Sequence, residues 1–283
     1  MLQVDESVLK DIGRGFSVPA QPSLLLELQE KVKQGEPNLD EIAELIAQDI
    51  SVSAKVLKTI NSPLYGLSRK IADIPKSVKY IGLNGIVSLV TSDLIRKSFN
   101  QQGCSISLES FWDNASNIAN TAVFIGQKLR RRIAKEKLFT LGLFHDCGIP
   151  VMAIKYNNYQ QVLDFAEKNP SEVITKIEEK AYQVSHATIG YYVATSWRLP
   201  TDICQLILRH HERDFLAKLD GSETQLAFAI LKMAENIVHQ HKYFRPSSDW
   251  QYLQDSIFTV LDCDEYDYQD LLEDLDEVLT STR

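Results

Sequence analysis

The chain has 283 residues, of which 44% are hydrophobic and 24% are charged, and its formal net charge is -8. These values lie near the averages for soluble globular proteins, so they exclude extended disorder and low-complexity repeats. The acidic balance argues against a general affinity for nucleic acid or anionic membranes, because both carry negative charge.

Helical periodicity dominates the first hundred residues. Asn38 can cap a helix, and Asp49 offers a break and a cap for the next one. The two helices would bury apolar stripes, formed by Leu39, Ile42, Ala43 and Ile46 and then by Val52, Val56, Leu57 and Ile60. Asn61-Ser62-Pro63 would end the second helix, because Pro63 lacks an amide donor and disfavours helix in the residue before it.

Two more apolar helical faces follow at residues 74–81 and 86–94. Pro75 fits a helix start, and Gly82 and Gly85 would allow a turn between the two faces. No strand pattern stands out, so this part of the chain is predicted to form several short helices with tight connections.

Residues 99–108 (FNQQGCSISL) are polar, contain a glycine and form the best linker candidate. Further helical patterns follow at residues 111–129, 138–144, 159–167, 171–195, 201–212 and 226–239. We therefore expect an all-α chain. It would have an N-terminal helical lobe (1–100), a larger helical lobe (101–260) and an acidic C-terminal tail or helix (261–283).

Charge is unevenly distributed along the chain. Residues 262–277 are strongly acidic, and Arg130, Arg131 and Arg132 form a basic run. Such runs are typical of solvated helix faces, and the alternative is a surface that docks a partner.

The cysteines and the N-terminus indicate the compartment. The four cysteines lie far apart, and no two form a CxxC pair. A chain of this size needs no disulfides, so we expect free thiols in a reducing compartment. The opening MLQVDESVLK has no basic region followed by an apolar one, so we expect no signal peptide. We also expect no membrane-spanning run, and together these features predict a cytoplasmic protein.

Four of the six histidines occur in settings that suggest a metal site. His145 and Asp146 are adjacent in GLFHDCGIP, His210 and His211 are adjacent, and His186 stands alone. Imidazole and carboxylate together suit a divalent transition metal, which can activate water for phosphoester hydrolysis. A buried helix rarely accepts an adjacent His and Asp unless they are paired, hydrogen-bonded or bound to metal.

The same residues also fit a structural role. His145 and Asp146 precede Gly148, and at a helix end an imidazole can hydrogen-bond free carbonyl groups. His210 and His211 fall late in a helix, where partial positive charge is favoured. Neighbouring side chains on a helix diverge by about 100°, so the members of a pair need not serve one ion.

Several segments, taken in order, resemble the HDOD family (HD-related output domain). They are VPAQPSLLLEL (18–28), IAELIAQDISVSAKVLKTINSPLYGL (42–67), SVKYIGLNGI (77–86), FWDNASNIA (111–119), LFTLGLFHDCGIPVM (138–152) and HATIGYYVATSWRLPTDICQLILRHHE (186–212). The resemblance spans roughly residues 15–240, and the shared order of the segments makes it more specific than any single motif. It implies a multi-helix HD-like bundle with a smaller N-terminal helical lobe.

HDOD domains resemble the HD phosphohydrolases, which bind metal through a His, a His-Asp pair and a distant Asp. His145 and Asp146 match the pair, and Glu235 lies near the position of the final Asp. Asn114 stands where the first His would fall. An amide oxygen is a neutral, hard ligand and a poor replacement for imidazole at a transition metal, so this resemblance implies a degenerate site.

The remaining histidines resemble those of the HD-GYP subgroup, which cleaves cyclic dinucleotides, although the GYP signature of that subgroup is missing. They could compensate for the lost ligand. The candidate metal ligands are His145, Asp146, His186, His210, His211 and Glu235.

Two functions remain open. The leading hypothesis is a non-catalytic regulatory or scaffolding module of bacterial signal transduction, which acts through protein partners of a signalling pathway. The alternative is a metal-dependent phosphohydrolase that acts on a nucleotide or cyclic dinucleotide, with one or two divalent ions held by the candidate ligands. Nucleic-acid binding through residues 130–137 is a third hypothesis, and the overall acidity argues against it. The sequence does not set the oligomeric state.

Overall fold

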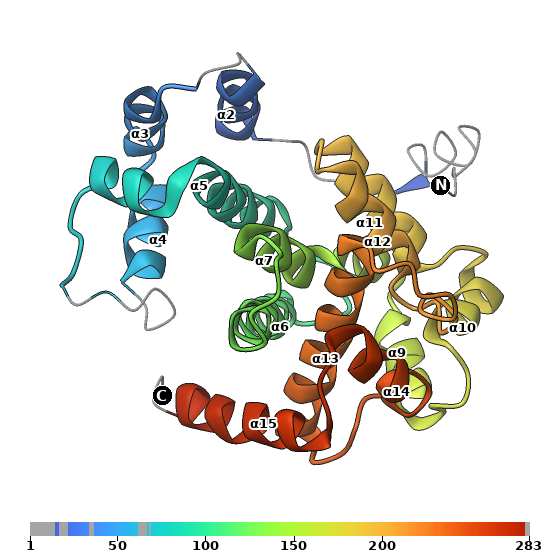
Figure 1. Ribbon diagram of the computed structural model, residues 1–283. Helices are drawn as coiled ribbons and strands as arrows, with labels where there is room; N and C mark the ends of the chain where they lie inside the picture. The colour runs from blue at the N-terminus through green and yellow to red at the C-terminus, as the bar shows by residue number, and fades with distance from the viewer. Residues whose placement is uncertain (1–14, 17–21, 34–36, 62–66, 68, 281–283) are drawn as a thin grey trace. The chain divides into compact units, whose positions relative to one another are not determined.

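The computed structural model describes residues 15–16, 22–33, 37–61, 67 and 69–280. Within these ranges the chain forms fourteen helices and no strand, which confirms the all-α prediction (Figure 1). It divides into two compact units. The smaller unit comprises Pro19–Asn100, and the larger one comprises Gln101–Arg283 together with Met1–Val18.

The smaller unit contains four helices. They are α2 (Ser23–Lys33), α3 (Leu39–Ala47), α4 (Ile50–Ile60) and α5 (Ile74–Ser98). The Asn38 side chain accepts a hydrogen bond from the backbone N–H of Asp40 at 2.9 Å, and that of Asp49 accepts one from Val52 at 2.9 Å. Both side chains satisfy amides that the first turn leaves unpaired, so the two predicted helix caps are confirmed.

Asn61 follows the last residue of α4 and ties the chain back on itself. Its side-chain amide donates to the carbonyl of Ile71, and the N–H of Ile71 donates to its Oδ1, both at 2.8 Å. The predicted helix stop is thus found at Asn61, whereas Ser62 and Pro63 lie outside the described residues. Helix α5 bends at Gly82, whose φ of 79° is a conformation that glycine adopts without steric cost.

Ten helices make up the described part of the larger unit. They are α6 (Leu108–Lys128), α7 (Lys135–Phe144), α8 (Gly148–Lys155), α9 (Tyr159–Lys168), α10 (Ile174–Tyr182), α11 (His186–Ser196), α12 (Thr201–Arg209), α13 (Glu223–Tyr243), α14 (Trp250–Leu261) and α15 (Glu265–Thr280). The single helix predicted over residues 171–195 is wrong. Gln183 adopts a left-handed conformation (φ 62°) that ends α10, and the Ser185 side chain then caps α11. This break puts His186 at the start of a helix.

Two glycines allow helices of the larger unit to approach closely. A Cβ on Gly142 would lie 2.6 Å from the Cα of Ala119, so α7 crosses α6 with almost no space between the backbones. A Cβ on Gly148 would lie 2.0 Å from the carbonyl oxygen of His186, so the start of α8 touches the start of α11. These contacts bring residues 145–147 beside α11.

One stretch of the described chain, Lys135–Lys155, is long and apolar enough to cross a membrane by length and composition. The expectation that no run reaches this length is therefore wrong. This stretch contains α7 and α8, and 72% of its apolar window is buried inside the protein, as in a core helix. The arms of α5, Ile74–Leu83 and Gly85–Ser98, pass the same test only jointly and are bent by 108°.

The basic run contacts the C-terminal helices. Arg131 donates through Nη2 to the carbonyl of Leu261 and, at 3.3 Å, to that of Asp262, where α14 ends. Lys128 pairs with Asp274 of α15 at 2.6 Å. Part of the basic charge therefore contacts the C-terminal part of the larger unit, in which most of the acidic residues lie on α15.

Candidate metal centre

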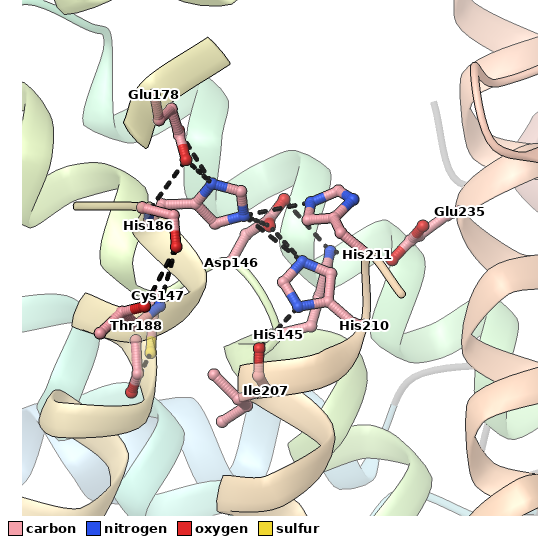
Figure 2. A network of polar contacts seen from close by, with 12 residues as sticks. His145, Asp146, Cys147, Glu178, His186, Thr188, Ile207, His210, His211 and Glu235 are labelled. Atoms are coloured by element: carbon pink, nitrogen blue, oxygen red, sulfur yellow. Dashed lines mark hydrogen bonds and ion pairs between the residues drawn. The ribbon is translucent and has the colours of Figure 1, made fainter. Parts of the chain in front are cut away.

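Five of the six candidate ligands lie where helices begin or end, and the sixth, Glu235, lies within α13 (Figure 2). His145 follows α7 and Asp146 lies in the turn before α8, whereas His186 begins α11. His210 and His211 follow α12. Of the two adjacent pairs, His210 and His211 both face one centre, whereas His145 and Asp146 reach it only through Asp146.

Asp146 connects the histidines. Its Oδ1 lies 3.1 Å from Nε2 of His210 and 3.2 Å from Nε2 of His186. The Nε2 of His211 lies 3.1 Å from that of His186. One donor atom of each of these four residues lies within 4.8 Å of the others, a spacing that can hold a metal ion. We call Asp146, His186, His210 and His211 the central group.

The outward nitrogen of each histidine has its own oxygen partner. The Nδ1 contacts are His186 with Glu178 at 2.8 Å, His210 with the Ile207 carbonyl at 2.7 Å, His211 with Asp249 at 3.2 Å, and His145 with the Gly142 carbonyl at 2.8 Å. Carbonyl and carboxylate oxygens only accept hydrogen bonds, so each Nδ1 carries the proton. In a neutral ring, Nε2 then directs a lone pair toward the centre.

Lone pairs brought this close together repel one another unless a proton or a cation lies between them. Here three imidazole nitrogens and a carboxylate oxygen converge, with the outer hydrogen bonds fixing each ring. Imidazole and carboxylate donors suit divalent transition metals, and metal-bound histidines regularly donate their other N–H to a carboxylate or carbonyl oxygen. The residues of the central group therefore fit such an ion.

The charge of the surroundings also fits a divalent ion. Four carboxylates contact the histidines, and they belong to Asp146, Glu178, Glu235 and Asp249. Two cationic side chains contact these carboxylates, and they belong to Lys232 and Arg213. With neutral histidines this set carries two formal negative charges in excess, which a divalent cation would balance. Buried charge is costly unless it is compensated in this way.

Protons can provide part of this compensation when no ion is bound. Burial disfavours a charged imidazole, yet the nearby carboxylates outweigh it and raise the pKa of His145 and, to about 10, that of His186. Burial, together with nearby charged rings, lowers the pKa values of His210 and His211. Burial alone would raise the pKa of Asp146, but its histidine contacts hold it well below the usual range.

A second set of contacts lies on the side of Glu235, which extends from α13. Its Oε1 lies 3.5 Å from Nε2 of His145 and is buried without a hydrogen-bond partner. Its Oε2 pairs with Lys232 at 2.5 Å, and Lys232 also contacts Asp249 at 3.1 Å. Both Glu235 and His145 thus border the central group without belonging to it.

A cleft of about 430 Å³ reaches this side of the site. Its lining includes His145, Asp146, His211 and Glu235, and also Asn114. The side chain of Asp146 is 26% exposed and that of His211 is 18% exposed, whereas those of His186 and His210 are fully buried. A ligand in the cleft would therefore meet the site through Asp146 and His211. A second cleft, of about 900 Å³, is also lined by His211.

Sequence reasoning missed three buried residues that organise the site. Lys232 carries a signal, because it interrupts the apolar run LAFAILKMA. Glu178 and Asp249 carry none. Glu178 lies among other charged residues and meets His186 only because the chain breaks between α10 and α11, and Asp249 lies 38 positions from His211.

Comparison with protein families gives one match over most of the chain. The model of the HDOD domain matches residues 18–213. An uncharacterized protein of Treponema pallidum (strain Nichols) is 29% identical over 202 residues, which cover 69% of this chain. The matched region covers 37% of that protein, so this chain spans well under half its length.

Solved structures share the fold at low sequence identity. An HDOD domain protein with unknown function from Geobacter sulfurreducens has a TM-score of 0.73 at 21% identity, and the match covers 97% of this chain and 94% of that one. A Shewanella amazonensis protein, whose name proposes a metal-dependent phosphohydrolase, has a TM-score of 0.61 at 21% identity, with 95% of each chain covered.

A third structure comes from Marinobacter aquaeolei VT8, and its name proposes a signal transduction protein. The TM-score is 0.69 at 14% identity, and the match covers 99% of this chain and 61% of that one. At these identities the likeness establishes the fold and leaves the activity open.

Proposed function

Because the chain belongs to the HDOD family, we propose that it is a regulatory module of signal transduction whose central group binds one divalent transition-metal ion. One observation carries the metal site: Asp146, His186, His210 and His211 direct four donor atoms within 4.8 Å of one another. Each imidazole also has an oxygen partner that fixes its proton on the outer nitrogen.

The number of protein donors favours a regulatory role over a catalytic one. Structural zinc sites use four protein ligands, whereas catalytic sites keep three and leave one position for water or substrate. The central group offers four donors. Asn114 lines the cleft where the resemblance to HD phosphohydrolases places a histidine ligand, which further weakens the case for hydrolysis. The Marinobacter protein, named for signal transduction, supports the same role by its fold.

The chain's own residues would make metal binding a structural event. Asp146 precedes α8, His186 begins α11 and His210 follows α12, so one ion would join three helix ends. An ion that binds only the folded state stabilises it, by about 2.7 kcal/mol at a free concentration a hundred times the Kd. We expect metal binding to raise Tm accordingly. A protein partner would sense whether the three helix ends are joined by the ion.

The regulatory role is tested by combining metal analysis with a turnover screen. Protein purified without chelator should hold about one ion per chain and should not hydrolyse phosphomonoesters, nucleotides or cyclic dinucleotides faster than the His210→Ala variant. Metal-dependent turnover that His210→Ala abolishes would overturn the regulatory role and would leave the metal site in place.

A metal-dependent phosphohydrolase that acts on a nucleotide or cyclic dinucleotide is the second candidate function. It is favoured by the cleft of about 430 Å³ that reaches His145, Asp146 and Glu235, and by the name of the Shewanella protein. A bound divalent ion lowers the pKa of water and polarises a phosphoester. Under this proposal the cleft holds the substrate beside Asp146 and His211. The same turnover screen tests it, because metal-dependent hydrolysis that His210→Ala abolishes would support it and absence of hydrolysis would contradict it.

The proposed partners and cellular location of the chain follow from its charge and its cysteines. A regulatory module needs protein partners of its pathway, and the acidic net charge of -8 favours proteins over nucleic acid as those partners. We propose a cytoplasmic location, as expected from the free, widely spaced thiols. Cell fractionation of the native protein checks this, and recovery with the membrane pellet after a salt wash would contradict it.

A further inference from the structure

Lys232 is a buried lysine within an otherwise apolar helix. Its side chain is 3% exposed, and it lies on α13 among Ile230, Leu231 and Met233, which are all buried. Burying an ammonium group is costly unless it is paired. Its burial therefore calls for a physical account in the contacts that it makes.

The contacts of Lys232 link two carboxylates that border the metal site. Its Nζ lies 2.5 Å from Oε2 of Glu235 and 3.1 Å from Oδ2 of Asp249. That same Oδ2 contacts the Nδ1 of His211 at 3.2 Å. Lys232 therefore neutralises Glu235 directly and reaches the central group through one intermediate residue.

The unpaired oxygen of Glu235 points to a second set of donors. Its buried Oε1 has no hydrogen-bond partner and lies 3.5 Å from Nε2 of His145. His145 in turn lies 3.2 Å from Oδ2 of Asp146, the oxygen that faces away from the central group. Two carboxylates and an imidazole thus lie together on this side, a donor set that suits a second cation.

We propose that the ammonium group of Lys232 takes the place of a second metal ion on the Glu235 side, so that the site holds one ion. The inference rests on the proposed function, because it assumes that the central group binds the first ion. An ion on Glu235 would meet a like charge bonded to the same carboxylate. With Lys232 present one divalent ion balances the charge, and a second would leave two positive charges in excess. Without Lys232 one ion leaves a negative charge uncompensated, and two ions leave an excess of only one positive charge.

Removing the charge of Lys232 should therefore create room for a second ion. In Lys232→Met the carboxylates of Glu235 and Asp249 lose the ammonium group that they share, and Arg213 still contacts Asp249. The matched control is Lys232→Met/Glu235→Gln, which removes both members of the buried pair. The control leaves the side chain volumes nearly unchanged and no excess negative charge on this side.

The experiment measures bound manganese per chain by elemental mass spectrometry after equilibrium dialysis, with circular dichroism to confirm folding. We expect one ion in the wild type, two in Lys232→Met and one in the double variant. One ion in a folded Lys232→Met variant would overturn the inference. Two ions in the wild type would also overturn it, while leaving the proposed metal site standing. No ion in the wild type would overturn both.

Two further measurements keep the inference testable if Lys232→Met does not fold. Wild-type protein saturated with Mn²⁺ should give the electron paramagnetic resonance signal of an isolated ion, and the signal of an exchange-coupled pair would overturn the inference. Asn114→His adds an imidazole to the cleft while keeping Lys232, and it should still bind one ion. Two ions in this variant would show that the missing ligand, and not Lys232, sets the number.

Discussion

The central group and the Glu235 side lie next to each other and differ in how their donor atoms are held. In the central group each histidine has an oxygen acceptor on its outer nitrogen, so the inner nitrogens face one point. On the Glu235 side one oxygen is buried without a hydrogen-bond partner, the other is paired with Lys232, and Asn114 lines the adjoining cleft. Since the Nδ1 of His145 also contacts a carbonyl oxygen, that of Gly142, the outer partners alone do not separate the two sides. The ammonium group of Lys232 on Glu235 does.

The largest expected effect comes from removing the residue that both sides share. Asp146→Ala deletes a central donor, and losing even a supporting partner costs about 10–100-fold in metal affinity, so we expect a loss of at least about 100-fold. Competition with a chromophoric chelator measures it. Asp255→Ala, which removes an exposed carboxylate of the same unit, is the control and should leave affinity unchanged. Equal affinities in the two variants would contradict the account.

The next largest effect should come from disrupting the close contact of α8 with α11, and it should appear as a lower stability of the fold. Gly148→Ala places a Cβ against the His186 carbonyl, and such overpacking costs about 1–3 kcal/mol and occasionally more. In a domain of this size we expect Tm to fall by about 2–4 °C for each kcal/mol. Gly221→Ala is the comparison, because the added Cβ would meet open space. It should lower the stability by about 1–2 kcal/mol, and only because alanine disfavours the left-handed backbone at this position. A Gly148→Ala variant as stable as the wild type would refute the packing described for these helices.

Changing Glu178, the outer partner of His186, should have an intermediate effect on the metal affinity of the central group. Glu178→Gln keeps the shape and an acceptor but removes the charge, and we expect metal affinity to fall about 10–100-fold. The neighbouring Glu179 is exposed, so Glu179→Gln is the matched control. Isothermal titration with the same metal compares them. Similar affinities would mean that the carboxylate does not orient His186.

The smallest effect should come from one residue further out. Tyr159 donates its hydroxyl to Glu178, which also receives the backbone N–H of His186. Since Glu178 keeps these other contacts in Tyr159→Phe, we expect a loss below about tenfold, the lower bound for direct outer partners. The same titration checks it, and a loss larger than that of Glu178→Gln would reverse the order proposed here.

Much of the fold was predictable because short-range signals carry it. Periodicity and capping residues predicted the helices at Leu39–Ala47 and Ile50–Ile60, and the bend at Gly82 followed from its lack of a side chain. The break at Gln183 was not predictable. A left-handed glutamine has no sequence signal, and the apolar pattern continues across it.

The sequence singled out the residue types that meet in the central group, but it did not predict how they are organised. The histidines and Asp146 stand out as residue types, and Figure 2 shows them facing one another. Their outer partners follow only from tertiary contacts, since Glu178 meets His186 through the break between α10 and α11, and Asp249 meets His211 across 38 positions. For the same reason the sequence could not show that His145 and Glu235 stand apart from the central group.

The most direct test of the account is the metal content of three proteins, the wild type, His210→Ala and His145→Ala, each dialysed against the same excess of metal. We predict about one ion per chain in the wild type and in His145→Ala, and almost none in His210→Ala. The reason is that His210 belongs to the central group and His145 does not. Absence of metal from the wild type, or an equal loss in both variants, would contradict the claim that these four residues form the metal site.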